Sequence, residues 1–206
     1  MTISQMFYED AVRYFKSANI VSNSYNRDID DELLLTPILY LLRHSVELII
    51  KALILKFVEQ SNSDVDVSQF KPCFENGVKS SKRLLENHSI GELFSFLRYF
   101  DKNNRLCSMF DDSELKFANK VVRNINNIDA KSDYFRYPIG KNNKRNKRHF
   151  VSMSNDDLAP EINKGYFLFL FGDSSENKVI PFTADEKYIK LADEMGSLAN
   201  MLMTKY

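Results

Sequence analysis

The chain has 206 residues, of which 44% are hydrophobic and 13% aromatic, enough to fill the core of one sizeable domain. Its 28 basic and 28 acidic residues cancel, so no overall field draws it to DNA or to a membrane surface. Cys73 and Cys107 are too few for a disulfide framework and lack the spacing of a metal site, so a reducing cytoplasm is the expected location.

Two helices are predicted in the first 60 residues. Residues 3–24 carry apolar side chains at helical spacing, and Thr2 and Gln5 have the spacing of a capping box. Thr36-Pro37 has the residue types of an N-cap and a first helical position, so the main helix is predicted to start there. That helix is long and apolar enough to cross a bilayer, but the ionisable side chains in its middle argue against a membrane span.

Three more helical segments are predicted before residue 132. Residues 79–87 resemble a short helix. Ser89 has the residue type of an N-cap, and Glu92 follows it at capping-box spacing, so another helix is predicted to start there. Residues 111–129 form a further amphipathic pattern.

The pattern changes near Asp133, where "YFRYPIG" is aromatic and extended, because Pro138 does not fit a helix interior. Short strands are predicted at "HFVSM", "GYFLFLF" and "VIPF", and Thr183 with Glu186 has the capping-box spacing that starts a last helix. The predicted fold is mainly α in a single domain 1–206, comprising a helical bundle 1–132, a small antiparallel β insert 133–183 and a returning C-terminal helix 184–206.

A narrow polar stripe runs along the main helix. Within "PILYLLRHSVELIIKALILKF", residues 37–57, a helical projection places on one line Tyr40, Arg43, His44, Glu47 and Lys51. Nearly all the rest of this helix is apolar, so it is predicted to lie at the centre of the bundle. The stripe has two interpretations. It is either a thin polar edge or ion-pair ladder, or the lining of a cleft in which Arg43 binds an anion and His44 titrates near neutral pH.

Three segments in order resemble bacterial proteins related to HEPN (higher eukaryotes and prokaryotes nucleotide-binding) domains. They are "PILYLLRHSVELIIKALIL", "NHSIGELFSFL" and "SDYFRYP", which together span roughly residues 30–140. The resemblance implies a helical bundle that dimerises, and a metal-independent RNase or nucleotide-binding effector of prokaryotic defence or of a toxin–antitoxin-like system. It also implies RNA as a ligand and an antitoxin or defence-system subunit as a protein partner.

The HEPN signature is an arginine followed after four to six residues by a histidine. Arg83 and His88, in "RLLENH", have this spacing, whereas Arg43 and His44 are adjacent and point about 100° apart on a helix. His88 also precedes the Ser89 cap, which favours a structural role at a helix entry. If the chain is an RNase, His44 or His88 acts as the general base, and Arg43 with Arg136 or Arg83 stabilises the phosphate.

Arg136, within "FRYP", has two interpretations. It can form a bidentate clamp on Glu47 that joins the β insert to the bundle, or it can serve as a second phosphate-binding arginine beside His44. The predicted catalytic residues are therefore Arg43, His44, Glu47, His88 and Arg136.

A basic turn follows in "KNNKRNKRH". It is either a solvated turn that discourages edge pairing or a nucleic-acid contact made by Lys141, Lys144, Arg145, Lys147 and Arg148. No phosphate-binding glycine loop, nucleophile elbow or histidine-rich metal pattern is present, so no metal or cofactor is expected. The alternative to an RNase is a non-catalytic module that binds a protein or a nucleic acid and keeps the stripe as a structural ladder.

Overall fold

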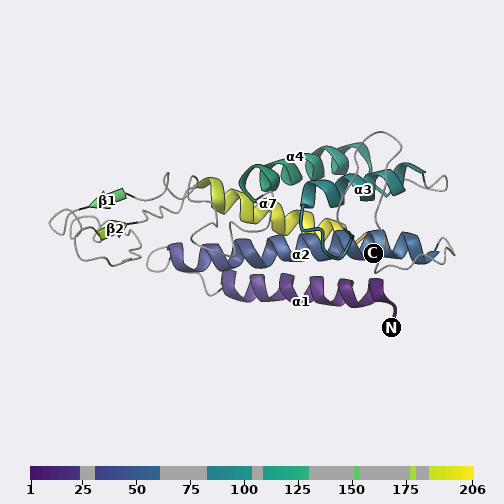
Figure 1. Ribbon diagram of the computed structural model, residues 1–206, viewed down its shortest axis with the longest axis horizontal. Helices are drawn as coiled ribbons and strands as arrows, with labels where there is room; N and C mark the ends of the chain where they lie inside the picture. The colour runs from purple at the N-terminus through teal and green to yellow at the C-terminus, as the bar shows by residue number, and fades with distance from the viewer. Residues whose placement is uncertain (24–30, 61–82, 104–108, 130–150, 154–176, 180–185) are drawn as a thin grey trace.

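The fold is a bundle of α-helices, shown by a computed structural model that describes residues 1–23, 31–60, 83–103, 109–129, 151–153, 177–179 and 186–206. The helices are α1 (Ile3–Asn23), α2 (Asp31–Gln60), α3 (Ile90–Asn103), α4 (Asp112–Asp129) and α7 (Glu186–Met203). Helix α2 contacts α1, α3 and α7, and α4 contacts α3 and α7, so α2 lies between α1 and the other three helices (Figure 1). The predicted helical bundle and the central place of the main helix are confirmed.

Helix α2 is central because it is apolar almost all round. Much of the core comes from this one helix, including Leu39, Val46, Ile49, Ile50, Leu53, Ile54 and Leu55, each at most 1% exposed. A surface helix buries only one stripe, whereas a helix that is hydrophobic on all sides must be surrounded by others. Among the described helices, none combines the length and the apolar character needed to cross a membrane.

Helix α1 approaches α2 closely because small residues line its inner face. Ser4, Ala11 and Ala18 are buried and recur every seven residues, which keeps them on one side of the helix. The hydroxyl of Ser45 on α2 donates a 2.8 Å hydrogen bond to the carbonyl of Ala11, so even the buried polar group at this contact has a partner.

The start of α2 differs from the prediction. The helix begins at Asp31, so Pro37 lies inside it rather than at its first position. Leu35, only 3% exposed, packs into the core, and its burial stabilises helix on the N-terminal side of the proline. Tertiary packing here outweighs the local preference for a helix start at Thr36-Pro37.

Helix α3 begins where the capping pattern predicts. The backbone N–H of Glu92 donates to the Ser89 hydroxyl at 3.3 Å, and the N–H of Leu93 donates to the Ser89 carbonyl at 2.9 Å. The segment before it was predicted as a helix over 79–87, but its described part, from Arg83, forms a turn with Glu86 N–H donating to the Arg83 carbonyl. Asn87 ends this turn by bonding to Ser89 and Glu92, which fixes the entry to α3.

Replacing Ser89 with alanine removes the cap hydroxyl of α3. We expect a loss of about 1 kcal/mol in the free energy of unfolding, the usual effect of losing an N-cap side chain. Urea denaturation measures the loss, and Ser89→Thr, which keeps a hydroxyl, should recover most of it. An alanine variant as stable as the wild type would contradict the capping role.

The described β structure is one short antiparallel pair. Strand β1 (Val151–Met153) pairs with β2 (Asn177–Val179) in the register Val151 with Val179, and these strands overlap the predicted "HFVSM" and "VIPF" segments. The predicted aromatic strand "GYFLFLF", the cap residue Thr183 and most of the predicted β insert lie outside the described residues. Helix α7 forms as expected and returns to the bundle beside α2 and α4.

Candidate functional site

Three charged side chains of the polar stripe form a closed ion-pair ladder on α2. Arg43 Nη1 lies 2.8 Å from Glu47 Oε2, and Lys51 Nζ lies 2.9 Å from Glu47 Oε1. The side chains of Arg43, Glu47 and Lys51 are 1%, 1% and 2% exposed. The i,i+4 spacing lets one carboxylate bridge two cations, one a turn before it and one a turn after.

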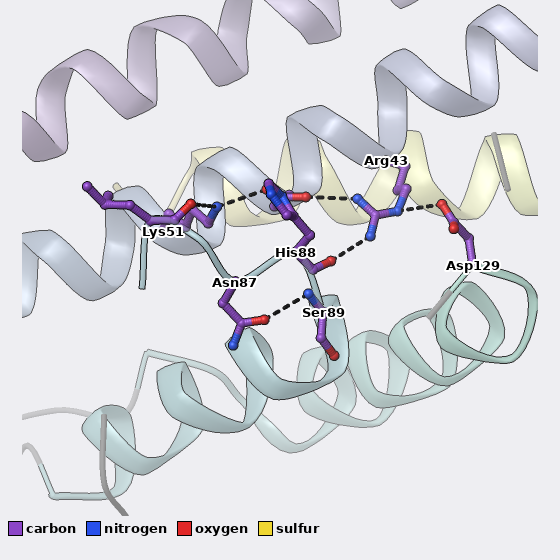
Figure 2. Close-up of polar contacts among 8 residues, drawn as sticks. Arg43, Lys51, Asn87, His88, Ser89 and Asp129 are labelled. Atoms are coloured by element: carbon purple, nitrogen blue, oxygen red, sulfur yellow. Dashed lines mark hydrogen bonds and ion pairs between the residues drawn. The ribbon is translucent and has the colours of Figure 1, made fainter. Parts of the chain in front are cut away.

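The turn before α3 covers the ladder and supplies two backbone acceptors to it. Arg43 Nη2 donates to the backbone carbonyl of His88 at 2.6 Å, and Lys51 Nζ donates to the carbonyl of Leu85 at 3.1 Å. Figure 2 shows Arg43 and Lys51 reaching toward this turn from α2. Two cations on one helix therefore fasten the chain segment that leads into α3.

Asp129 closes the far end of the ladder. Its Oδ2 atom lies 2.8 Å from Arg43 Nε, and its side chain is only 2% exposed (Figure 2). Arg43 thus uses different nitrogens for Glu47, for the His88 carbonyl and for Asp129, which ties α2, the turn before α3 and the end of α4 together. The four formal charges of Arg43, Lys51, Glu47 and Asp129 cancel, as buried ions require.

His88 is the one member of the cluster that reaches solvent. Its Nδ1 atom lies 2.9 Å from Glu47 Oε1, and its side chain is 40% exposed whereas Glu47 is 1% exposed. An ionised carboxylate can only accept hydrogen bonds, so Nδ1 must carry the proton it shares with Glu47. In the neutral imidazole this leaves Nε2 as the basic nitrogen.

The charge partners of Glu47 change its pKa strongly. Burial by itself raises the pKa, but the adjacent Lys51, Arg43 and His88 outweigh burial and lower the pKa of Glu47 from 4.5 to about 2. Glu47 therefore stays ionised at any physiological pH and acts as a fixed acceptor rather than as a proton donor.

Because the folded-state pKa lies below the unfolded value, Glu47 stabilises the protein fully above the unfolded value and loses that contribution as the pH falls from about 4.5 to about 2. We expect the contribution to be on the order of 3 kcal/mol. Urea unfolding from pH 7 to pH 3 should show the stability difference between wild type and Glu47→Gln narrowing on acidification. A difference independent of pH would mean that the charge of Glu47 is not what stabilises the fold.

His44 belongs to a different environment. Its ring lies edge-on to Tyr14 of α1, with ring centroids 4.4 Å apart, and stacks with Tyr40 at 5.8 Å. The ring of His44 thus packs between tyrosines of α1 and α2, and it points about 100° away from the adjacent Arg43 on the helix. The stripe of the helical projection thus divides in two. His44 contacts α1, whereas Arg43 and Lys51 contact the turn before α3.

Of the predicted site residues, the structure brings together Arg43, Glu47 and His88. Arg83, the arginine of the signature spacing, is exposed at the start of the same turn. Outside the described residues lie Arg136, with its predicted clamp on Glu47, and the basic residues Lys141, Lys144, Arg145, Lys147 and Arg148.

Sequence reasoning missed Asp129 and the two carbonyl acceptors. Asp129 is the last residue of α4, where a negative charge opposes the helix dipole. That unfavourable placement was the available signal that a cation holds the carboxylate. The carbonyls of Leu85 and His88 carry no sequence signal, because any residue supplies one.

The described residues contain no group of three or more His, Cys, Asp or Glu side chains arranged to hold a metal ion. Comparison of the chain with protein-family models, with curated proteins and with solved structures finds no match.

Proposed function

We propose that the chain is a HEPN-like effector that cleaves RNA without a metal, with His88 as the general base and Glu47 as the residue that orients it. The observation that carries the proposal is the 2.9 Å pair between a fully buried carboxylate and a half-exposed histidine. In many catalytic sites one ring nitrogen of a histidine acts as the base, while a carboxylate binds the other ring nitrogen and orients the imidazole.

In the proposed reaction His88 Nε2 takes the proton of a ribose 2′-hydroxyl. The 2′ oxygen then bonds to the adjacent phosphorus, and the bond between phosphorus and the 5′ oxygen of the next nucleotide breaks. The leaving oxygen takes up the proton from the imidazolium. Arg83 and Arg136 are the proposed partners of the phosphate, because Arg43 already donates to Glu47 and to the carbonyl of His88.

The ladder has a positioning role in this proposal. Arg43 and Lys51 hold Glu47 ionised and hold the turn that carries His88, so the imidazole is placed by fixed charges. The resemblance to HEPN proteins adds a homodimer, a cytoplasmic location, RNA as substrate and a neutralising or defence-system protein partner to the proposal.

The test is incubation of the purified chain with total RNA and with tRNA in the presence of EDTA. The proposal expects cleavage that survives chelation and yields 2′,3′-cyclic phosphate ends. Intact RNA after incubation at enzyme concentrations well above those of the substrate would overturn it.

A second function is favoured by the closed geometry of the ladder. Glu47 pairs with both Arg43 and Lys51, the two cations donate to backbone carbonyls, and all three side chains are at most 2% exposed. In that case the chain is a non-catalytic module that binds a protein or a nucleic acid, and the ladder only holds the fold. RNA that binds but is never cut, by wild type and by His88→Asn alike, would favour this module.

A further inference from the structure

An open hollow of about 440 Å³ lies between α3 and α4, beginning at Ser89, one residue after His88. Its volume falls in the usual range for small-molecule sites, about 300–1,000 Å³. Two stripes with the same i, i+4, i+7 spacing face each other across it, and they consist of Gly91, Ser95 and Arg98 on α3 and Asn119, Arg123 and Asn126 on α4.

Glycine brings the two helices together at one end of the hollow. A Cβ added to Gly91 would lie 3.2–3.3 Å from the side chain of Asn126, closer than most real contacts of that kind. The helices therefore approach each other closely at Gly91, at one end of the hollow.

The chemistry of the hollow fits an anion. Arg98 and Arg123 contribute two guanidinium groups, one from each helix, while the single acidic side chain in the lining, Glu92, accepts a hydrogen bond from Asn87 at 2.9 Å. Asn119 Oδ1 accepts a 3.2 Å hydrogen bond from Arg98 Nη1, which links α3 to α4 within the lining of the hollow. Planar guanidinium donors match the oxygens of a phosphate group.

We propose that this hollow binds a phosphate group, supplied either by a free nucleotide or by the backbone of single-stranded RNA. Arg98 and Arg123 make the ionic contacts, and the amide of Asn126 and the hydroxyl of Ser95 complete the polar lining. The site extends the proposed function, but it does not depend on catalysis by His88.

The test measures binding of a fluorescein-labelled 2′-O-methyl oligonucleotide by anisotropy. Such an oligonucleotide lacks the 2′-hydroxyl and cannot be cleaved by the proposed mechanism, so failure of the binding site and failure of the RNase proposal are distinguishable. The double variant Arg98→Gln/Arg123→Gln is compared with Arg13→Gln, an exposed arginine on α1 that pairs with Asp10.

The proposal expects the double variant to bind at least about tenfold more weakly, with the slope of log K against log salt reduced by about 0.7 per arginine, and Arg13→Gln to bind like the wild type. Competition by 5′-AMP and inorganic phosphate would assign the site to a free nucleotide. The same variant effect without competition would assign it to the RNA backbone. Unchanged affinity in the double variant, or no binding of any of these probes by the wild type, would overturn the proposal.

Discussion

Replacing His88 with asparagine is expected to lower the rate of RNA cleavage by at least about 100-fold. A general base contributes roughly 10²–10⁴-fold to such reactions, and the asparagine amide cannot accept the proton of a ribose 2′-hydroxyl. The same amide can place an N–H near the position of Nδ1 and keep the hydrogen bond to Glu47, so the fold should survive. Cleavage is measured on one labelled RNA in EDTA, with thermal unfolding as the check on folding.

His44→Asn is the matched control for this experiment. The His44 ring packs against Tyr14 and Tyr40, so its replacement should leave the cleavage rate within a fewfold of the wild type. The opposite result, with activity lost in His44→Asn and kept in His88→Asn, would assign the role of general base to His44 instead of His88.

Replacing Glu47 with glutamine is expected to reduce the free energy of unfolding by about 3–5 kcal/mol. The carboxylate is the shared partner of Arg43, Lys51 and His88, and its loss leaves two buried cations facing a neutral amide. Breaking a buried ion pair by removing one partner has an effect of this size. It is a large part of the total stability of a domain, about 5–15 kcal/mol, and corresponds to a fall of roughly 6–20 °C in Tm.

The control is Glu194→Gln, which removes a glutamate from the pair that joins α4 and α7. Lys120, its partner at 2.7 Å, is 54% exposed, so we expect a loss of about 1 kcal/mol or less. Urea denaturation of both variants gives the comparison. Equal, small losses would mean that the ladder contributes no more to stability than the partly exposed pair of Lys120 and Glu194.

The sequence offered an ion-pair ladder as one of two interpretations of the stripe, and it did not predict the surroundings of that ladder. The i,i+4 spacing of these charges on an apolar helix is typical of ion pairs, and in the structure Arg43, Glu47 and Lys51 are buried and paired. Helical periodicity is a local property, so the sequence also predicted the helices α1, α4 and α7 with ends within a few residues of those in the structure.

The prediction failed where distant segments decide the outcome. The Thr36-Pro37 pair predicted that α2 starts there, but the helix begins at Asp31, and the burial of Leu35 favours this earlier start. Asp129 reaches Arg43 from 86 positions along the chain, and no local pattern specifies such a pair. The contact between His88 and Glu47 likewise depends on how the turn before α3 folds onto α2, and the capping pattern predicted only that a helix would begin there.

The central claim is that Glu47 orients His88 so that Nε2 is its basic nitrogen. Nitrogen-15 NMR of the imidazole, at an alkaline pH where the ring is neutral, reports the tautomer directly. The account predicts that Nδ1 carries the proton in the wild type, because an ionised carboxylate 2.9 Å away can only accept it. A wild-type His88 with its proton on Nε2 would contradict both the orienting role of Glu47 and the assignment of His88 as the general base.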